Sequence, residues 1–145
     1  MGSVALYVLA CLLPAVLLHT GSNSYTRTGP KLTWNGYQSL KGWELLLTGW
    51  FGIFTGNFAV LANPLLWLSW LLFGSRRERG AIGFSAAALL FSMFTFELIV
   101  RPYYFDEGGV VCGYLKSIEA GFVCWVASMA LILVSSIRFR WRPGS

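Results

Sequence analysis

Residues 81–100, AIGFSAAALLFSMFTFELIV, and residues 117–137, SIEAGFVCWVASMALILVSSI, decide the fold that the sequence predicts. Each stretch is almost entirely apolar and about 20 residues long, the length that a helix needs to cross the hydrocarbon core of a membrane. Each contains a single charged residue, Glu97 or Glu119. We therefore expect a membrane-spanning helix in each stretch.

The composition of the whole chain favours the same class of protein. Of its 145 residues, 56% are hydrophobic and 12% are charged, whereas soluble domains carry about 25% charged residues. The net charge is +5, but the basic residues flank apolar stretches and form no nucleic-acid-binding motif. We therefore expect the lipid bilayer as a partner and no nucleic acid.

Two further apolar blocks lie at residues 4–18 and 43–73. The first is short and contains Pro14, and it lacks the basic start of a signal peptide, so we interpret it as a short helix. The second would be about 46 Å long as a straight helix, against a hydrocarbon core of about 30 Å. Because Pro64 cannot donate a helical hydrogen bond and restricts Asn63, we expect one kinked crossing; two half-helices are the alternative.

The four blocks together predict an all-α fold in a single membrane domain, residues 1–145. This fold is a polytopic four-transmembrane-helix bundle with a kinked second helix. The expected elements are helices at about 4–18, 43–73, 81–100 and 117–137, with an outer loop at 19–42. Within the outer loop, Asn35-Gly36 is typical of a tight hairpin turn.

The arginines set the expected orientation. Three arginines lie within residues 76–79 and three within residues 138–142. Short basic segments beside membrane helices stay in the cytoplasm. Both termini are therefore expected to be cytoplasmic, with the longer loops outside.

Small residues recur at helical spacing in the second block. Gly49, Gly52, Gly56, Ala59 and Asn63 fall on one helix face. In lipid, such faces let two helices approach closely. Gly52 and Gly56 are therefore expected to pack inside the bundle, or alternatively to form a self-association surface.

The last block has a small face and a bulky face. The small face includes Gly121 and Ser128, and the bulky face includes Phe122 and Met129. We expect the small face to meet other helices and the bulky face to meet lipid.

Charged residues fall in three pairs at helical spacing. The pairs are Lys41/Glu44, Glu97/Arg101 and Lys116/Glu119. Each predicts an ion pair at the outer end of a helix. Glu97 is the deepest and could instead be functional, and Asn57 and Asn63 are expected either to bond other helices or to face an ion path.

Enzyme chemistry is not expected. The chain has one histidine, His19, and none of the hydrolase, zinc-protease, P-loop or dinucleotide motifs. The sequence therefore predicts no catalytic residue, no metal site and no cofactor.

The segment Gly42–Trp50, GWELLLTGW, is continued by Ala62–Leu66, ANPLL. It resembles a segment of small uncharacterised bacterial multi-pass membrane proteins. The resemblance implies a bacterial inner (plasma) membrane and carries over no named activity and no functional residue.

The function that we expect is interaction. We predict a membrane accessory protein that associates with a larger membrane complex or with itself, an immunity-like protein being one form. The alternative is a subunit of an oligomeric channel or small-solute transporter, and a membrane enzyme ranks last. Recognition is expected on the outer surface, around Trp34 and Tyr37 and the charged pairs, because binding residues concentrate on loops.

Overall fold

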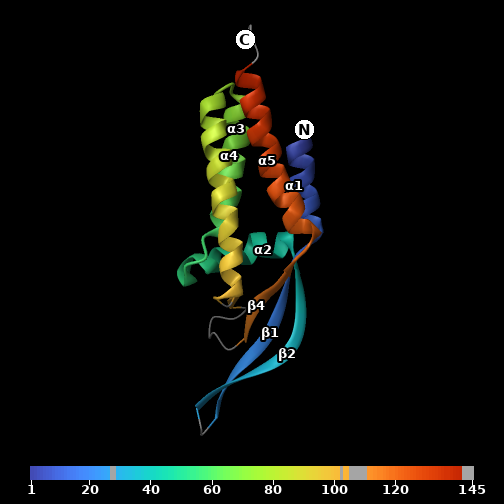
Figure 1. The fold of residues 1–145 in the computed structure, drawn as a ribbon, viewed down its shortest axis with the longest axis vertical. Helices are drawn as coiled ribbons and strands as arrows, with labels where there is room; N and C mark the ends of the chain where they lie inside the picture. The colour runs from blue at the N-terminus through green and yellow to red at the C-terminus, as the bar shows by residue number, and fades with distance from the viewer. Residues whose placement is uncertain (27–28, 102, 105–110, 142–145) are drawn as a thin grey trace.

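The computed structural model describes residues 1–26, 29–101, 103–104 and 111–141. A helical bundle forms one end of the molecule and an antiparallel sheet forms the other (Figure 1). The bundle contains α1 (Gly2–Leu12), α3 (Ala62–Gly74), α4 (Glu78–Ser92), which the 3-10 helix η3 (Met93–Ile99) continues, and α5 (Ala120–Arg140).

The sheet makes the expected all-α fold wrong, because the protein is mixed α and β. Its strands are β1 (Pro14–Thr26), β2 (Gly29–Lys41), β3 (Tyr103–Tyr104) and β4 (Val111–Ile118), in the order β2-β1-β4-β3. The expected outer loop at 19–42 is most of the long β1–β2 hairpin. Asn35-Gly36 lies within β2, where Thr20 pairs with Gly36 and Gly21 with Trp34, so that Asn35 is a bulge and not a turn.

The first and last apolar blocks each divide between a strand and a helix. Helix α1 ends before Pro14, because Leu13 adopts the extended conformation that a following proline favours. Residues 14–18 of the first block then begin β1, and residues 117–118 of the last block end β4. A short apolar run is compatible with either a strand or a helix, so its hydrophobicity alone left this choice open.

The second block is broken, but not at the expected place. It forms α2 (Gly42–Thr48), the 3-10 helices η1 (Gly49–Thr55) and η2 (Ala59–Leu61), and then α3. Figure 1 shows α2 lying crosswise at the sheet end of the bundle. The break falls at Gly56, whose φ of +87° ends η1 in the left-handed conformation. Pro64 sits in the first turn of α3, where its missing N–H costs no helical bond.

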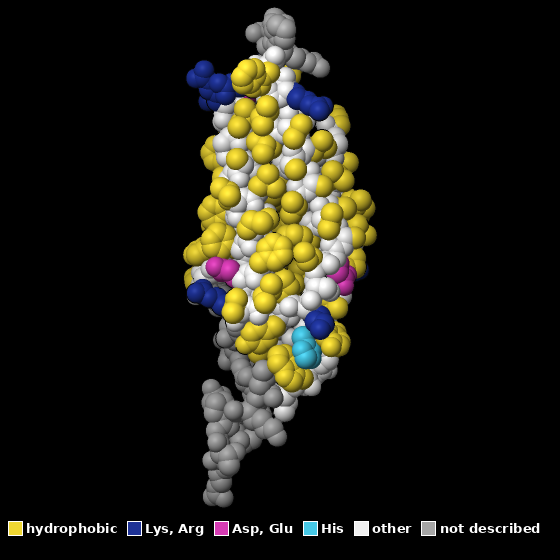
Figure 2. All heavy atoms as spheres, in the orientation of Figure 1, with side chains coloured by type: hydrophobic (Ala, Val, Ile, Leu, Met, Phe, Trp, Pro, Cys, Tyr) yellow, Lys and Arg dark blue, Asp and Glu magenta, His cyan; other side chains and the backbone are white. Residues whose placement is uncertain are grey.

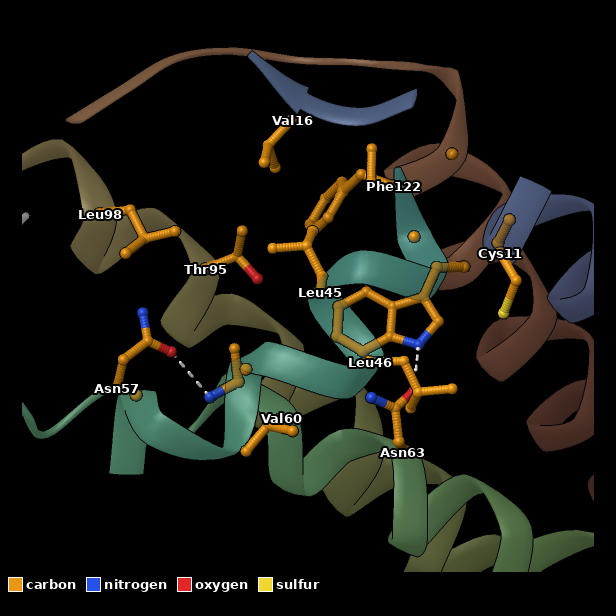
Figure 3. A pocket seen from close by; sticks show the side chains of 18 of the residues that line it. Cys11, Val16, Leu45, Leu46, Asn57, Val60, Asn63, Thr95, Leu98 and Phe122 are labelled. Atoms are coloured by element: carbon orange, nitrogen blue, oxygen red, sulfur yellow. Dashed lines mark hydrogen bonds between the residues drawn. The ribbon is translucent and has the colours of Figure 1, made fainter. Parts of the chain in front are cut away.

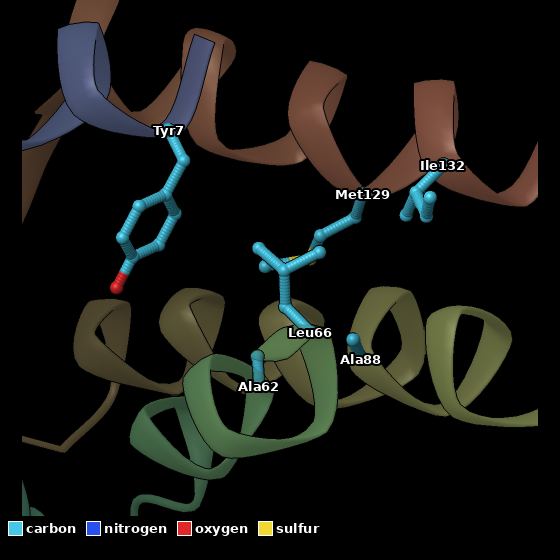
Figure 4. Packing of buried hydrophobic residues seen from close by; sticks show 6 residues of the cluster. All are labelled: Tyr7, Ala62, Leu66, Ala88, Met129 and Ile132. Atoms are coloured by element: carbon cyan, nitrogen blue, oxygen red, sulfur yellow. The ribbon is translucent and has the colours of Figure 1, made fainter. Parts of the chain in front are cut away.

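Helix α5 lies between α1 on one side and α3 and α4 on the other. Its small residues face α1, because the Ser3 hydroxyl donates to the Ser128 carbonyl oxygen at 2.7 Å. Its bulky residues do not face outward as expected. Phe122 and Met129 are buried, and Met129 packs with Leu66 in the core that Figure 4 shows. The expected lipid face was therefore wrong.

The bundle buries small polar side chains and exposes large apolar ones. Leu71 on α3, Leu90 on α4 and Val123 on α5 are 67%, 70% and 61% exposed. The buried polar side chains of the bundle include six serines: Ser3, Ser69, Ser85, Ser92, Ser128 and Ser136. Most of these hydroxyls bond carbonyl oxygens of their own helix, for example Ser85 to Ala81 at 2.7 Å.

In the sheet region, large apolar side chains are buried and polar ones are exposed. Val16 and Leu18 on β1 and Leu40 on β2 are buried together against Leu45 of α2 and Leu115 of β4. Gln38, Ser39 and Lys116 are exposed. Apolar residues thus form the core of the sheet region, as in a water-soluble domain.

Two helices in the described part of the chain are long and apolar enough to cross a membrane. They are Glu78–Ile99, which is α4 with η3, and α5. Both correspond to the two deciding stretches of the sequence. The expected bundle of four spanning helices is not found, because α1 and the η2–α3 segment are shorter.

Candidate functional site

A pocket of about 90 Å³ lies where the bundle meets the sheet. It is lined by α1, β1, α2, the 3-10 helices η1, η2 and η3, and the first turns of α3 and α5. Figure 3 shows Asn63, Thr95 and Phe122 converging on it from α3, η3 and α5. Most of the lining is apolar, and none of the described lining side chains is charged.

Two close approaches of the backbone shape this pocket. A Cβ atom on Gly42 would collide with the carbonyl oxygen of Ala10, and one on Gly121 would lie 2.6 Å from that of Pro14. Only glycine fits at these positions. The N-terminal ends of α2 and α5 can therefore close against the junction between α1 and β1.

Asn63 is the central polar group of the pocket. Its side-chain oxygen accepts hydrogen bonds from the Tyr7 hydroxyl at 3.2 Å and from the Trp125 indole nitrogen at 3.0 Å. The expected bond between helices is thus found, with partners from α1 and α5. Its amide nitrogen has no hydrogen-bond partner among the described residues.

Asn57 stabilises one wall of the same pocket. Its side-chain oxygen accepts from the Ala59 backbone N–H at 3.0 Å, and its amide nitrogen donates to the Phe94 carbonyl oxygen at 3.3 Å. These bonds fix the chain after Gly56 and fasten it to η3. Asn57 therefore holds the pocket wall in place with both ends of its side chain engaged.

Gly52 and Gly56 do not form the predicted helix-packing stripe. Gly52 lines the pocket, where an added Cβ would lie 3.3 Å from the carbonyl oxygen of Asn57. Gly56 ends η1, and the Arg101 guanidinium lies over it, 2.6 Å from where a Cβ would be. Since the helix breaks between Gly56 and Asn63, the five small residues never share one face.

The pairs Lys41/Glu44 and Lys116/Glu119 are not ion pairs of a helix. The Glu44 carboxylate accepts the Lys41 backbone N–H at 2.7 Å and caps α2. Lys116 is a bulge in β4, because Leu17 pairs with Ser117 and Leu18 with Leu115. Glu119 precedes α5 and accepts the Ser39 hydroxyl at 3.5 Å.

Glu97 and Arg101 also form no ion pair in the described part of the chain. Their contact is between backbone atoms, since the Arg101 N–H donates to the Glu97 carbonyl oxygen at 2.7 Å. One Glu97 carboxylate oxygen, Oε2, is buried without a hydrogen-bond partner. The Arg101 side chain instead extends towards Gly56.

An aromatic row crosses the sheet on the face away from the buried leucines. Tyr37, His19 and Tyr114 are direct neighbours on β2, β1 and β4. The imidazole of His19 stacks on Trp34 at 4.1 Å and on Tyr37 at 4.9 Å between ring centroids. Trp34 also meets Tyr114 edge-on at 6.0 Å.

The bulge at Asn35 creates this row. Side chains alternate between the two faces of a strand, so Trp34 and Tyr37 would point to opposite faces of a regular strand. The extra residue at Asn35, with Gly36 at a φ of +124°, shifts the alternation by one. Trp34 and Tyr37 were expected in the recognition region. His19 and Tyr114 were not expected in it, because only strand pairing brings them beside Trp34 and Tyr37.

No groups of His, Cys, Asp or Glu that could hold a metal ion occur among the described residues.

The comparisons with known proteins find no relative of this chain. No family model, curated protein or solved structure matches this chain.

Proposed function

We propose that this chain is an integral membrane protein whose bundle lies in the bilayer and whose sheet stands outside it. The inverted packing of the bundle carries this proposal. Only 28% and 33% of the most apolar windows of Glu78–Ile99 and α5 are buried inside the protein. A core helix of a soluble protein would be mostly buried, so these apolar surfaces need lipid to cover them.

The dimensions and charges support this placement. Helix α5 has 21 residues, or about 32 Å, close to the roughly 30 Å of the hydrocarbon core. Figure 2 shows an apolar belt between Lys and Arg side chains at one end and charged side chains and His at the other. The whole net charge of +5 lies in residues 76–79 and 138–142, which hold six arginines and Glu78.

The positive-inside rule then gives the orientation. The arginine-rich end is cytoplasmic, and the sheet faces the opposite side. Antiparallel packing of α1 on α5 directs Met1 towards the arginine end as well. A bacterial inner membrane is the setting that the sequence resemblance favours.

The proposed activity is binding of another membrane protein through the aromatic row of the sheet. Trp34 and Tyr37 are 49% and 63% exposed although both are large aromatics. Tyr and Trp dominate the energetics of protein interfaces. Stacking on His19 holds both rings in place, so little side-chain entropy is lost on binding. The transport alternative is less well supported, because the described pocket lining carries no charge.

Site-specific photo-crosslinking in cells tests this activity. A benzophenone amino acid at Tyr37 should give one discrete protein adduct, and the same group at Gln38, on the opposite face, should not. Trp34→Ala should reduce the Tyr37 adduct about tenfold or more, because truncating an interface aromatic typically costs about 2 kcal/mol. An adduct at Leu71 or Val134 with none at Tyr37 would move recognition to the bundle and reject this proposal.

Cysteine labelling tests the orientation separately. A membrane-impermeant maleimide added to intact cells should react with Ser22→Cys and not with Ser75→Cys. Labelling of Ser75→Cys from outside would invert the orientation.

A further inference from the structure

The pocket between bundle and sheet contains two polar groups without partners. Asn63 is 8% exposed and Thr95 is 6% exposed. Neither the Asn63 amide nitrogen nor the Thr95 hydroxyl has a hydrogen-bond partner among the described residues. Both atoms border the open space of the pocket, since the fully buried side-chain atoms without a partner in the described residues are Ser69 Oγ and Glu97 Oε2. Two such groups facing one cavity indicate a site that a ligand completes.

The lining specifies the chemistry of that ligand. Around the two polar groups the walls are apolar, including Leu45, Leu98 and Phe122. The Asn63 nitrogen is a donor, so it requires an acceptor oxygen, and the Thr95 hydroxyl can donate to a second oxygen of the same ligand. A charged head group has no counter-charge among the described lining side chains. The ligand therefore has a neutral carbonyl oxygen on an apolar chain.

The size and depth of the pocket further limit the kind of ligand that it can bind. A single water needs roughly 10–15 Å³, so about 90 Å³ holds a chain segment. The lining residues of α5 end at Trp125, five residues after the helix begins, or about 8 Å along it. Under the proposed membrane placement, the pocket therefore extends from the level of the lipid ester groups, at the start of α5, about 8 Å into the hydrocarbon core.

We infer that the pocket binds a fatty-acyl ester, the glycerol-ester region of a membrane lipid, with ester oxygens on Asn63 and Thr95 and the acyl chain along Phe122 and Leu98. This inference rests on the membrane placement but not on the aromatic row. Occupancy of the pocket would fasten α2 and η1 beneath the bundle.

Photolabelling of the purified full chain in mild detergent tests the inference. The probe is a phosphatidylethanolamine with a diazirine in its acyl chain, and labelled peptides are mapped by mass spectrometry. We expect labelling of η3 and the start of α5 in the pocket wall. Excess methyl palmitate, which keeps ester and chain, should compete, whereas hexadecane should not.

Three variants separate binding from folding. Thr95→Val removes a hydroxyl that has no described partner, so it should lower pocket labelling about three- to tenfold without lowering the unfolding temperature. Gly49→Leu should abolish labelling by filling the pocket. Ser69→Ala, a buried serine of α3 outside the pocket, is the matched control and should label like the wild type.

The outcomes distinguish the inference from the membrane placement. Labelling of the bundle belt without the pocket would mean that water fills the pocket, and equal labelling of Thr95→Val and the wild type would mean that Thr95 binds no lipid oxygen. Either result would overturn the inference. The membrane placement is tested separately by cell fractionation, and recovery of the chain in the soluble fraction would reject it.

Discussion

The bundle and the sheet bury opposite kinds of side chain, although one chain of high hydropathy makes both. In the bundle, serines and alanines lie inside and most leucines are not buried, as Ser85 and Leu90 of α4 illustrate. In the sheet, Val16 and Leu18 lie inside and polar residues lie outside. Helices in lipid gain little from burying leucine and associate through close packing of small residues. This contrast is what the proposed placement of the bundle in lipid and of the sheet in water would produce.

The largest effect that separates the two regions is expected for a charge on the bundle exterior. Leu90→Arg places an arginine near the middle of Glu78–Ile99, where it should cost roughly 2.5–3.5 kcal/mol in a bilayer. The amount of folded protein in the membrane fraction should fall sharply. Gln38→Arg, at an exposed site of the sheet, should change stability by at most about 0.5 kcal/mol. Equal tolerance of both variants would mean that the bundle exterior faces water.

A second effect concerns the small side chains in the interior of the bundle. Ser85 is fully buried, so Ser85→Leu should force α4 away from its neighbours and cost about 2 kcal/mol. Ser85→Ala nearly keeps the volume and removes only hydrogen bonds to the carbonyl oxygens of Ala81 and Ile82, so it serves as the control. Thermal unfolding in detergent measures both. A Leu variant as stable as the Ala variant would show that the helices are not closely packed there.

The smallest effect is expected in the sheet, at its bulge. Gly36 has a φ of +124°, which strains any residue with a Cβ. Gly36→Ala should therefore cost about 1 kcal/mol and disturb the stacking of Trp34 and Tyr37 on His19. Gly83→Ala, where an added Cβ meets nothing in the described structure, is the control. Near-ultraviolet circular dichroism follows the aromatic stacking, and an unchanged spectrum would mean that the bulge does not set it.

The sequence by itself predicted the two longest helices. Residues 81–100 and 117–137 are long enough and apolar enough that local composition leaves few alternatives, and the structure has helices at Glu78–Ile99 and Ala120–Arg140. It also predicted an interruption in the block at 43–73, because that block is too long for one span. The expected single crossing with a kink near Asn63-Pro64 was wrong, since the break lies at Gly56. Length and composition act locally, and local signals are sufficient for such elements.

The candidate site could be predicted only in part. Asn63 stood out as a polar residue in an apolar block, and its bonds to Tyr7 and Trp125 join residues 56 and 62 positions apart. Thr95 carried no signal, since one threonine in an apolar helix is ordinary. Its importance comes from the pocket that surrounds it.

Only the tertiary structure decided the rest. Residues 14–18 and 117–118 form strands because β1 finds partners in β2 and β4 that are distant in the sequence. Asn35-Gly36 is a bulge because the register of that hairpin places it inside β2. Hydrophobicity fixes which residues avoid water, but a short apolar run can satisfy its backbone hydrogen bonds within a helix or across a sheet. Which of the two forms depends on the strands that the rest of the chain brings alongside it.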